Sequence, residues 1–276
     1  MLHTERLMDP PIVVETQWLA DRLETTDLAV VDVRPPQFYT QGHIPGGVNL
    51  PFFLVTGQGG ETLPAGALSA RLGALGLTRQ HHIVAYDDGG SPAAASLFRL
   101  LRYYRHPLVS VLNGGITKWL HEGRPSANGL SRPSPTKYEP GEPDRSQLAQ
   151  TEDVLQAIGA SGSVILDVRS PAEYLGMERT AMRDGHIPGA INIEWSNNLT
   201  QTDDAIYLLR PEDELRSLYE QAGLTPDKKA LVYCASGNRA SETYMVLKEL
   251  GYPDVSVYQS GWQEWGNRPE LPVEER

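Results

Sequence analysis

Apolar and polar positions alternate in a regular order along most of the chain. Short apolar runs, which are typical of buried strands, lie at residues 28–33, 83–86, 109–112, 164–168, 230–233 and 255–258. Apolar residues recur at helical spacing over residues 17–24, 66–75, 93–103, 151–158, 211–222 and 241–250. Strands that alternate with helices predict an α/β fold, in which a mostly parallel sheet carries helices on both faces.

The same order of elements occurs twice. A strand that ends in Asp-Val-Arg lies at residues 28–34 and again at 164–169, and Gly-His-Ile-Pro-Gly follows at 42–46 and 185–189. Thr16 and Thr151 are expected to cap the first helix of each copy. We therefore predict two tandem domains, residues 13–122 and 151–276. The segment 123–150 is rich in Pro, Ser and Gly, which predicts an extended linker.

Composition narrows the classes of partner. The formal net charge is -11, so we expect neither a nucleic-acid partner nor an anionic membrane partner. No apolar run is long enough to span a bilayer, and the first residues lack the apolar core of a secretory signal, which predicts a cytoplasmic protein. A single cysteine excludes an internal disulfide, and no metal-ligand spacing or nucleotide-binding glycine loop occurs. Neither a metal nor another cofactor is expected.

The single cysteine, Cys234, stands at a position suited to chemistry. It follows the strand at 230–233 and precedes the helix at 241–250, so its thiol is predicted to lie over a helix N-terminus. Backbone N–H groups and the positive end of the helix dipole favour an anion there and lower the pKa of a thiol. Arg239 adds a positive charge. The alternative is a small buried apolar side chain, the usual role of a free cysteine; the strand–turn–helix context favours a reactive thiol.

The two copies differ at the position of the cysteine. Asp87 in the first copy corresponds to Cys234 in the second, and no arginine follows it at the position of Arg239. A carboxylate would be an unusual substitute for a packing side chain, because burying it without a partner is costly. We therefore expect the first domain to keep the scaffold and to lack the chemistry.

Four features together resemble a known family. The paired Asp-Val-Arg strands, the two Gly-His-Ile-Pro-Gly segments, the loop Cys-Ala-Ser-Gly-Asn-Arg-Ala at 234–240 and the Gly-Trp ends of both copies resemble a two-domain (tandem) rhodanese of the thiosulfate/3-mercaptopyruvate sulfurtransferase family. The resemblance implies an inactive N-terminal domain, a catalytic C-terminal domain and a persulfide carried on Cys234. It also implies that backbone N–H groups hold this persulfide, those of Ala235, Ser236, Gly237, Asn238, Arg239 and Ala240.

The implied reaction is sulfur transfer by covalent catalysis. The thiolate of Cys234 takes the outer sulfur of a small anionic donor, thiosulfate, and passes it to a thiophilic acceptor such as cyanide, a thiol or a thioredoxin-like protein. Arg239 is expected to orient the loop or to bind the donor, and Asp167 to brace the loop. A different class remains open, a persulfide-carrying or redox-sensing module that serves a protein partner.

The length of the loop argues against a further class, the cysteine phosphatases. Four residues separate Cys234 from Arg239, one fewer than in the phosphate-binding loop of those enzymes. The shorter loop is expected to be too small for a tetrahedral phosphate and to fit one additional sulfur atom.

The choice of donor rests on fewer residues. Ser236 stands where mercaptopyruvate enzymes carry a serine, which makes 3-mercaptopyruvate the alternative donor. The Gly-Arg that those enzymes carry after the Asp-x-Arg strand is Ala172-Glu173 here, and a carboxylate at this place would repel an anionic donor. Because the arginine that would bind the carboxylate of mercaptopyruvate is missing, we prefer thiosulfate. Arg179 and Arg183 are candidates to supply the missing positive charge.

Residues that the two copies share are expected to be structural. His43 and His186 occur in both Gly-His-Ile-Pro-Gly segments, including that of the domain without the cysteine, so they are interpreted as hydrogen-bonded turn residues and not as general bases. Arg169 is expected to form a local ion pair with Glu173.

Overall fold

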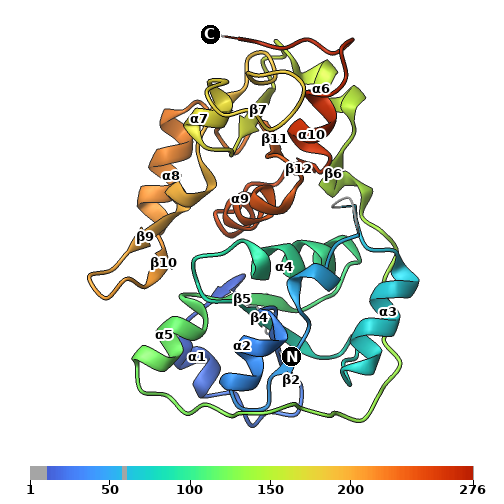
Figure 1. The fold of residues 1–276 in the computed structure, drawn as a ribbon, viewed down its shortest axis with the longest axis vertical. Helices are drawn as coiled ribbons and strands as arrows, with labels where there is room; N and C mark the ends of the chain where they lie inside the picture. Colours follow the sequence, from blue (N-terminus) through green and yellow to red (C-terminus); the bar gives the residue numbers. More distant parts are fainter. Residues whose placement is uncertain (1–10, 58–60, 276) are drawn as a thin grey trace, which may run out of the picture.

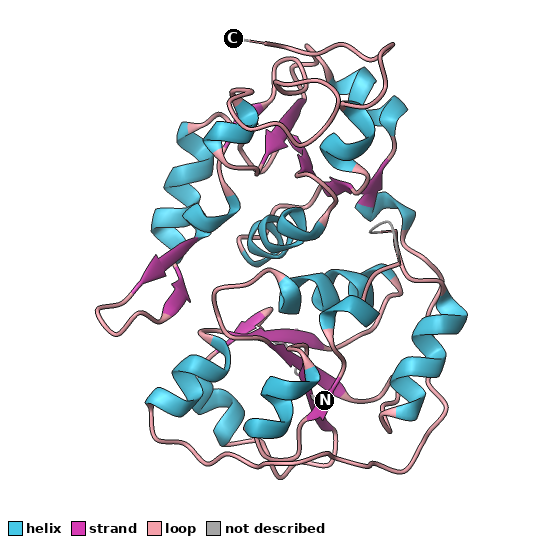
Figure 2. Cartoon of the chain, viewed as in Figure 1, coloured by secondary structure: helices cyan, strands magenta, loops and turns pink. Residues whose placement is uncertain are grey.

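The chain folds into two α/β domains, which lie one above the other in Figure 1. The structure is a computed structural model that describes residues 11–57 and 61–275. Each domain is built on a sheet of five strands, and every pair of neighbouring strands in the two sheets is parallel. Helices cover both faces of each sheet (Figure 2). The predicted fold class is therefore confirmed.

The N-terminal domain has the sheet order β1-β5-β4-β2-β3. Its central strands are covered on both faces and therefore read as continuous apolar runs without alternation. Its elements are β1 (Val13–Val14), α1 (Thr16–Ala20), β2 (Leu28–Asp32), α2 (Pro36–Gln41), β3 (Val48–Asn49), the 3-10 turn η1 (Phe52–Leu54), α3 (Ala65–Ala74), β4 (His82–Tyr86), α4 (Ala93–Tyr103), β5 (Val109–Leu112) and α5 (Gly115–His121).

The C-terminal domain repeats this order as β6-β12-β11-β7-β8 and adds the antiparallel hairpin β9–β10. Its elements are η2 (Arg145–Gln147), β6 (Leu148–Ala149), α6 (Thr151–Ala157), β7 (Ser163–Asp167), α7 (Pro171–Tyr174), β8 (Ile191–Asn192), η3 (Trp195–Asn198), β9 (Leu199–Gln201), β10 (Tyr207–Leu209), α8 (Glu212–Gln221), β11 (Lys229–Tyr233), α9 (Asn238–Glu249), β12 (Val255–Tyr258) and α10 (Gly261–Trp265). No helix within the described ranges has the length and apolar character needed to cross a bilayer.

The segment expected as a linker is packed against the N-terminal domain. Ala127 pairs with His43 in an isolated β-bridge, the N–H of Thr136 donates to the carbonyl of Gly73, and Tyr138 is buried. The segment also contains η2 and β6 at its end, so regular structure begins before residue 151. It has no other helix or strand in Figure 1, where it follows the outer surface of the domain.

The two expected helix caps are wrong. Glu15 and Gln150 occupy the N-cap positions of α1 and α6. The hydroxyl groups of Thr16 and Thr151 instead donate to distant carboxylates, to Glu122 at 2.6 Å and to Glu264 at 2.9 Å. A threonine at the start of a helix therefore serves in both domains to fix α1 or α6 to a later segment of the same domain.

Helices α4 and α9 form the contact between the domains. They lie side by side between the two sheets in Figure 1 and pack directly against each other. Both are buried along most of their length. Since α4 begins after β4 and α9 after β11, the two β–α turns, one with Asp87 and one with Cys234, lie next to the domain interface.

Candidate active site

The turn between β11 and α9 carries the cysteine. Cys234 is the first residue after β11, and α9 begins at Asn238. Between them, Gly237 has φ 85°, a left-handed conformation that residues with a side chain rarely adopt. A Cβ at this position would also lie 3.0 Å from Cγ and from the carbonyl oxygen of Gln259. The tight turn therefore requires glycine here for its conformation and for space.

The first carbonyl groups of the loop are bound by α10. Those of Cys234 and Ala235 accept hydrogen bonds from the N–H groups of Trp262 and Gln263, at 2.8 and 3.0 Å, at the start of α10. This contact depends on Gly261, which has φ 56° and whose added Cβ would lie 2.2 Å from the carbonyl oxygen of Cys234. The repeated Gly-Trp segment is thus explained, because it lets α10 fix the outer side of the loop.

The amide groups of the loop are directed towards the sulfur or have no partner. The N–H of Gly237 donates to Sγ of Cys234 at 3.1 Å. Within the described part of the chain, the N–H groups of residues 235, 236 and 238–240 have no hydrogen-bond acceptor. The thiol itself is only 1% exposed. A helix N-terminus with unpaired N–H groups next to a buried sulfur is suited to an anion on that sulfur.

Arg239 and Glu173 form an ion pair beside the loop. The two terminal nitrogens of Arg239 donate to the two carboxylate oxygens of Glu173 at 2.5 and 2.8 Å. Burial acts to raise the pKa of Glu173, but the hydrogen bond from Arg239 and the N–H of Ser170 outweigh it, so the pKa is lowered. The pKa of Arg239 is raised by this hydrogen bond and by the nearby thiol of Cys234. The guanidinium therefore interacts both with the carboxylate of Glu173 and with the thiol of Cys234.

The expected pair between Arg169 and Glu173 is wrong. Arg169 is fully buried and pairs with Asp167, at 2.6 Å between Nη2 and Oδ2. Glu173 is directed elsewhere because Ser170 and Glu173 form a capping box at the start of α7, which aims the carboxylate at Arg239. The Ser-x-x-Glu spacing in the sequence could have indicated this box.

Asp167 has its partners on its own strand end and not on the loop. It accepts from the backbone N–H and the guanidinium of Arg169, which also donates to the carbonyl of Gly185. Asp32 and Arg34 repeat this arrangement in the N-terminal domain. No hydrogen bond joins the Asp167 carboxylate to residues 234–240 in the described ranges, so a direct brace on the loop stays a prediction.

The two histidines have the structural contacts expected of them. Nδ1 of His43 donates to the carbonyl of Tyr39, and Nδ1 of His186 to that of Tyr174, both at 3.0 Å. Each imidazole also stacks on the ring of the same tyrosine. Both histidines therefore fix the turn that follows α2 or α7.

The two candidate arginines of the longer second copy have other partners. Arg179 forms an exposed ion pair with Asp184. Arg183 donates to the backbone carbonyls of Trp265, Arg268 and Leu271 and so fixes the chain after α10. These contacts engage both guanidinium groups, and a role of either arginine in binding the donor stays a prediction.

The N-terminal domain has a carboxylate where the C-terminal domain has sulfur. Asp87 is buried and accepts from the N–H groups of Gly89 and Ala94, at 2.7 and 2.9 Å. Burial raises its pKa to about 6. The hairpin β9–β10 of the other domain covers this turn, since Leu199 and Leu209 line the same small cavity as Asp87. In the N-terminal domain, the backbone N–H groups of the β–α turn thus bind a carboxylate of the same turn, that of Asp87.

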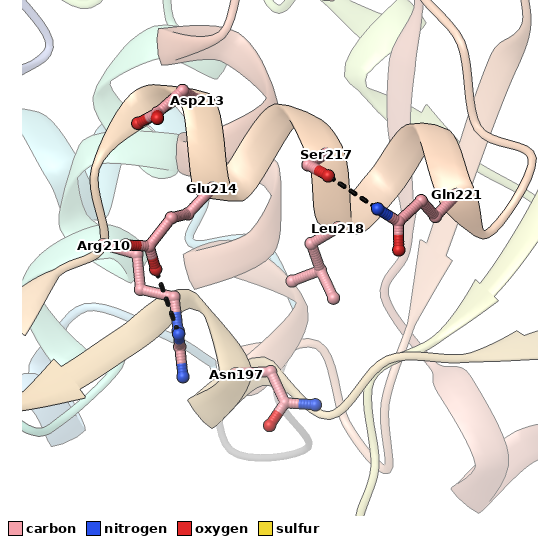
Figure 3. A pocket seen from close by; sticks show the side chains of 7 residues that line it. All are labelled: Asn197, Arg210, Asp213, Glu214, Ser217, Leu218 and Gln221. Carbon is pink, nitrogen blue, oxygen red and sulfur yellow. Dashed lines mark hydrogen bonds and ion pairs between the residues drawn. The ribbon is translucent and has the colours of Figure 1, made fainter.

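A separate surface groove of about 620 Å³ lies along α8 (Figure 3). Four of its polar side chains are paired, Arg210 with Glu214 and Gln221 with Ser217. None of its lining residues belongs to the loop 234–240, so the groove takes no part in the site described above.

This fold and this site define a class of protein, one with a buried cysteine at the β–α turn of the second of two similar parallel α/β domains. The chain belongs to the rhodanese family. The family model described as the Rhodanese-like domain matches residues 15–122 and 150–268, one copy for each half of the chain.

Curated relatives match over nearly the whole length. A thiosulfate sulfurtransferase of Azotobacter vinelandii is 36% identical over 268 residues, covering 96% of this chain and 97% of its own. One of Pseudomonas aeruginosa is also 36% identical, with 96% and 98% covered. A sulfur carrier protein of Thermus thermophilus is 34% identical, with 96% of each chain covered.

Solved structures show the same fold at lower identity. An anaerobic ergothioneine biosynthesis enzyme from Chlorobium limicola, in complex with trimethyl histidine, superposes with a TM-score of 0.85 at 24% identity, covering 96% of this chain and 70% of that one. The structure of YnjE gives 0.81 at 23% identity, with 96% and 68% covered.

Proposed function

We propose that the protein is a sulfurtransferase that moves the outer sulfur of thiosulfate to a thiophilic acceptor through a persulfide on Cys234. One observation carries the proposal. The N–H of Gly237 donates to Sγ, while the first loop carbonyls, those of Cys234 and Ala235, accept hydrogen bonds from the start of α10. The backbone N–H groups of the loop are therefore suited to bind negative charge on this sulfur.

The first half-reaction forms the persulfide. The thiolate of Cys234 attacks the outer sulfur of thiosulfate, a new S–S bond forms, and the bond to the sulfonate breaks with its electron pair leaving on sulfite. The N–H groups of residues 235–240 then hold the terminal sulfur, in the way that an oxyanion hole holds oxygen. In the second half-reaction an acceptor such as cyanide attacks that sulfur, and the thiolate of Cys234 leaves.

The ion pair beside the loop bears on the choice of donor. Mercaptopyruvate carries a carboxylate that would need a free arginine as its partner, but both terminal nitrogens of Arg239 are already engaged by Glu173. Ser236 remains available as the feature that favours mercaptopyruvate. Because Arg239 is engaged by Glu173, we favour thiosulfate over 3-mercaptopyruvate as the donor. We assign to Arg239 the role of orienting the loop.

A sulfur-carrier role is the second candidate. The Thermus thermophilus relative is named as a sulfur carrier protein, and a buried persulfide is protected until a protein partner reaches it. In this case the protein would accept sulfur once from a donor and release it rapidly only to a partner thiol, for example on a thioredoxin-like protein.

A comparison of donors tests the proposal. Sulfite release from thiosulfate and pyruvate release from 3-mercaptopyruvate are measured with cyanide as acceptor, on the native protein and on Cys234→Ser. The proposal expects steady turnover that is faster with thiosulfate and absent in the variant. Turnover with mercaptopyruvate alone would replace the donor, and a single stoichiometric release of sulfite without turnover would favour the carrier. Activity that survives in Cys234→Ser would refute the proposal.

A further inference from the structure

The N-terminal domain places an arginine against the active loop. Arg99 lies on α4, in the middle of the helix that packs on α9, and is only 5% exposed. It forms no ion pair with any carboxylate of the described residues. An unpaired guanidinium in such a place is unusual, because burying a charge without a partner costs free energy.

A short chain of hydrogen bonds connects this arginine to the sulfur. Nε of Arg99 donates to Oγ of Ser241 at 2.9 Å, and that hydroxyl donates to the carbonyl of Gly237 at 3.0 Å. Gly237 is the residue whose N–H donates to Sγ of Cys234. Ser241 thus holds the guanidinium of the first domain directly behind the left-handed turn of the second.

Of the two arginines near the sulfur, Arg99 is the one whose positive charge no carboxylate of the described residues compensates. Arg239 is adjacent to Cys234, but its charge is compensated by Glu173 in the ion pair. Arg99 has no such compensation. Burial lowers its pKa, and the nearby Tyr244 and Cys234 oppose that shift; an arginine remains protonated throughout the working range of proteins. It is therefore a permanent positive charge beside a group that becomes an anion.

We propose that Arg99 is the counter-charge of the Cys234 anion, supplied across the interface by the domain that lacks the cysteine. This inference rests on the proposed use of Cys234 as an anionic nucleophile. Arg99 is a positioning residue, because it acts on the sulfur through its charge and through the loop and does not touch the donor. On this account the N-terminal domain takes part in the chemistry even though its own turn holds Asp87.

The test measures the pH dependence of alkylation of Cys234 by iodoacetamide, followed by intact mass. Arg99→Met and Arg99→Gln remove the charge, Arg99→Lys keeps it, and Arg102→Met removes an exposed cation from the same helix as a control. We expect the midpoint of the alkylation profile to rise by about one pH unit in the two neutral variants. The midpoint should stay close to the native value in Arg99→Lys and in Arg102→Met.

Thermal unfolding separates this role from a structural one. Because Arg99 is an uncompensated buried charge, Arg99→Met is expected to keep or to raise the Tm while its thiol becomes less reactive at neutral pH. An unchanged midpoint in both neutral variants, an equal shift in Arg99→Lys, or loss of folding in both neutral variants would overturn the proposal. Alkylation needs no sulfur donor, so its pH profile can be interpreted even if the protein does not react with thiosulfate.

Discussion

Among single residues, the clearest difference between the two domains is the group at the β–α turn that carries the negative charge. Asp87 is itself the anionic group, and the N–H groups of Gly89 and Ala94 satisfy its carboxylate. Cys234 carries a shorter side chain, and in our proposal the N–H groups of its loop hold one further atom, the transferred sulfur. A carboxylate and a cysteine persulfide are both negative groups that extend from Cβ. The N-terminal turn is therefore an internal analogue of the state that we propose for the loaded sulfur.

Variants of Arg239 and Glu173 distinguish two roles of Arg239, support of the sulfur and stabilisation of the fold. Arg239→Gln and Glu173→Gln both break the same ion pair and should each cost about 2 kcal/mol of unfolding free energy, since each leaves one buried or half-buried charge without its partner. If Arg239 supports the sulfur, kcat/KM for thiosulfate should fall about 100-fold in Arg239→Gln and about 10-fold or less in Glu173→Gln. Denaturant unfolding and steady-state kinetics provide the two quantities. Equal kinetic losses in both variants would mean that Arg239 only holds the structure.

Sequence reasoning reached some of these residues and not others. Cys234, its loop and Asp87 could be found because a reactive cysteine needs a particular strand–turn–helix context that is visible in the chain. The partner of Glu173 could not, because residues 173 and 239 are 66 positions apart and only the fold brings their side chains together. The charge expected from Arg179 and Arg183 was assigned from sequence position alone, and the fold directs these side chains to Asp184 and to the carbonyls after α10.

At the scale of elements, the start of α10 determines the shape of the active loop. Its first two N–H groups after Gly261 bind the carbonyls of Cys234 and Ala235, and α5 repeats the contact through Gly115 and the carbonyl of Asp87. A glycine at this point is thus a feature of the β–α turn in both domains. Its role is backbone approach, which the active and the inactive copy need equally.

Gly261→Ala should damage both the loop and the domain. The added Cβ would lie 2.2 Å from the carbonyl oxygen of Cys234, and φ 56° is unfavourable for alanine, so we expect a loss of roughly 2–4 kcal/mol and a large loss of turnover. Gly66→Ala is the matched control, since nothing lies within 4 Å of its added Cβ in α3 and alanine is the better helix former. Chemical denaturation and thiosulfate kinetics on both variants check this. A stable, active Gly261→Ala would show that α10 does not shape the loop.

The longer elements could be predicted from the chain, and the short ones could not. Strands β5 and β12 and helix α4 begin and end at the predicted residues. The two strands are buried along their whole length and therefore stand out as continuous apolar runs, and α4 is long enough to show a helical pattern. The edge strands β1, β3, β6 and β8 have two residues each, too few to carry a pattern. The hairpin β9–β10 was also missed, since it is stabilised by covering the other domain.

At the scale of the whole molecule, two carboxyl groups meet across the domain interface. Glu242 of α9 is buried and lines the same cavity as Asp87. Burial, followed by the nearby Asp87, raises the pKa of Glu242 to about 8. Both native pKa values, about 6 and about 8, lie above the ordinary values. The stability that these groups contribute is therefore complete at low pH and is lost as the pH rises through 6 and 8.

Glu242→Gln should remove much of this pH dependence. The variant keeps the shape of the side chain and cannot ionise, so its Tm is expected to exceed that of the native protein at pH 8–9 and to approach it near pH 5. Thermal unfolding over this range is the measurement, with the exposed Glu220→Gln as the control. Parallel curves for native protein and Glu242→Gln would contradict a repulsive carboxyl pair at the interface.

The duplicated domains were visible in the sequence, but their mutual dependence was not. Repeats of strand and motif reveal that the chain contains two copies, and Asp87 reveals that one lacks the thiol. The contact of Arg99 with Ser241 joins residues 142 positions apart, and no periodicity in either copy indicates it. Arg99 stands inside an apolar helical run, which is a signal of burial but not of its partner.

We propose above all that Cys234 accepts a single sulfur atom and holds it as an anion. The most direct test is intact mass after incubation with thiosulfate and removal of excess reagent. We expect a gain equal to one sulfur atom that is confined to Cys234, is lost on addition of cyanide with release of thiocyanate, and is absent from Cys234→Ser. A native protein whose mass does not change, or a gain that persists in Cys234→Ser, would contradict it.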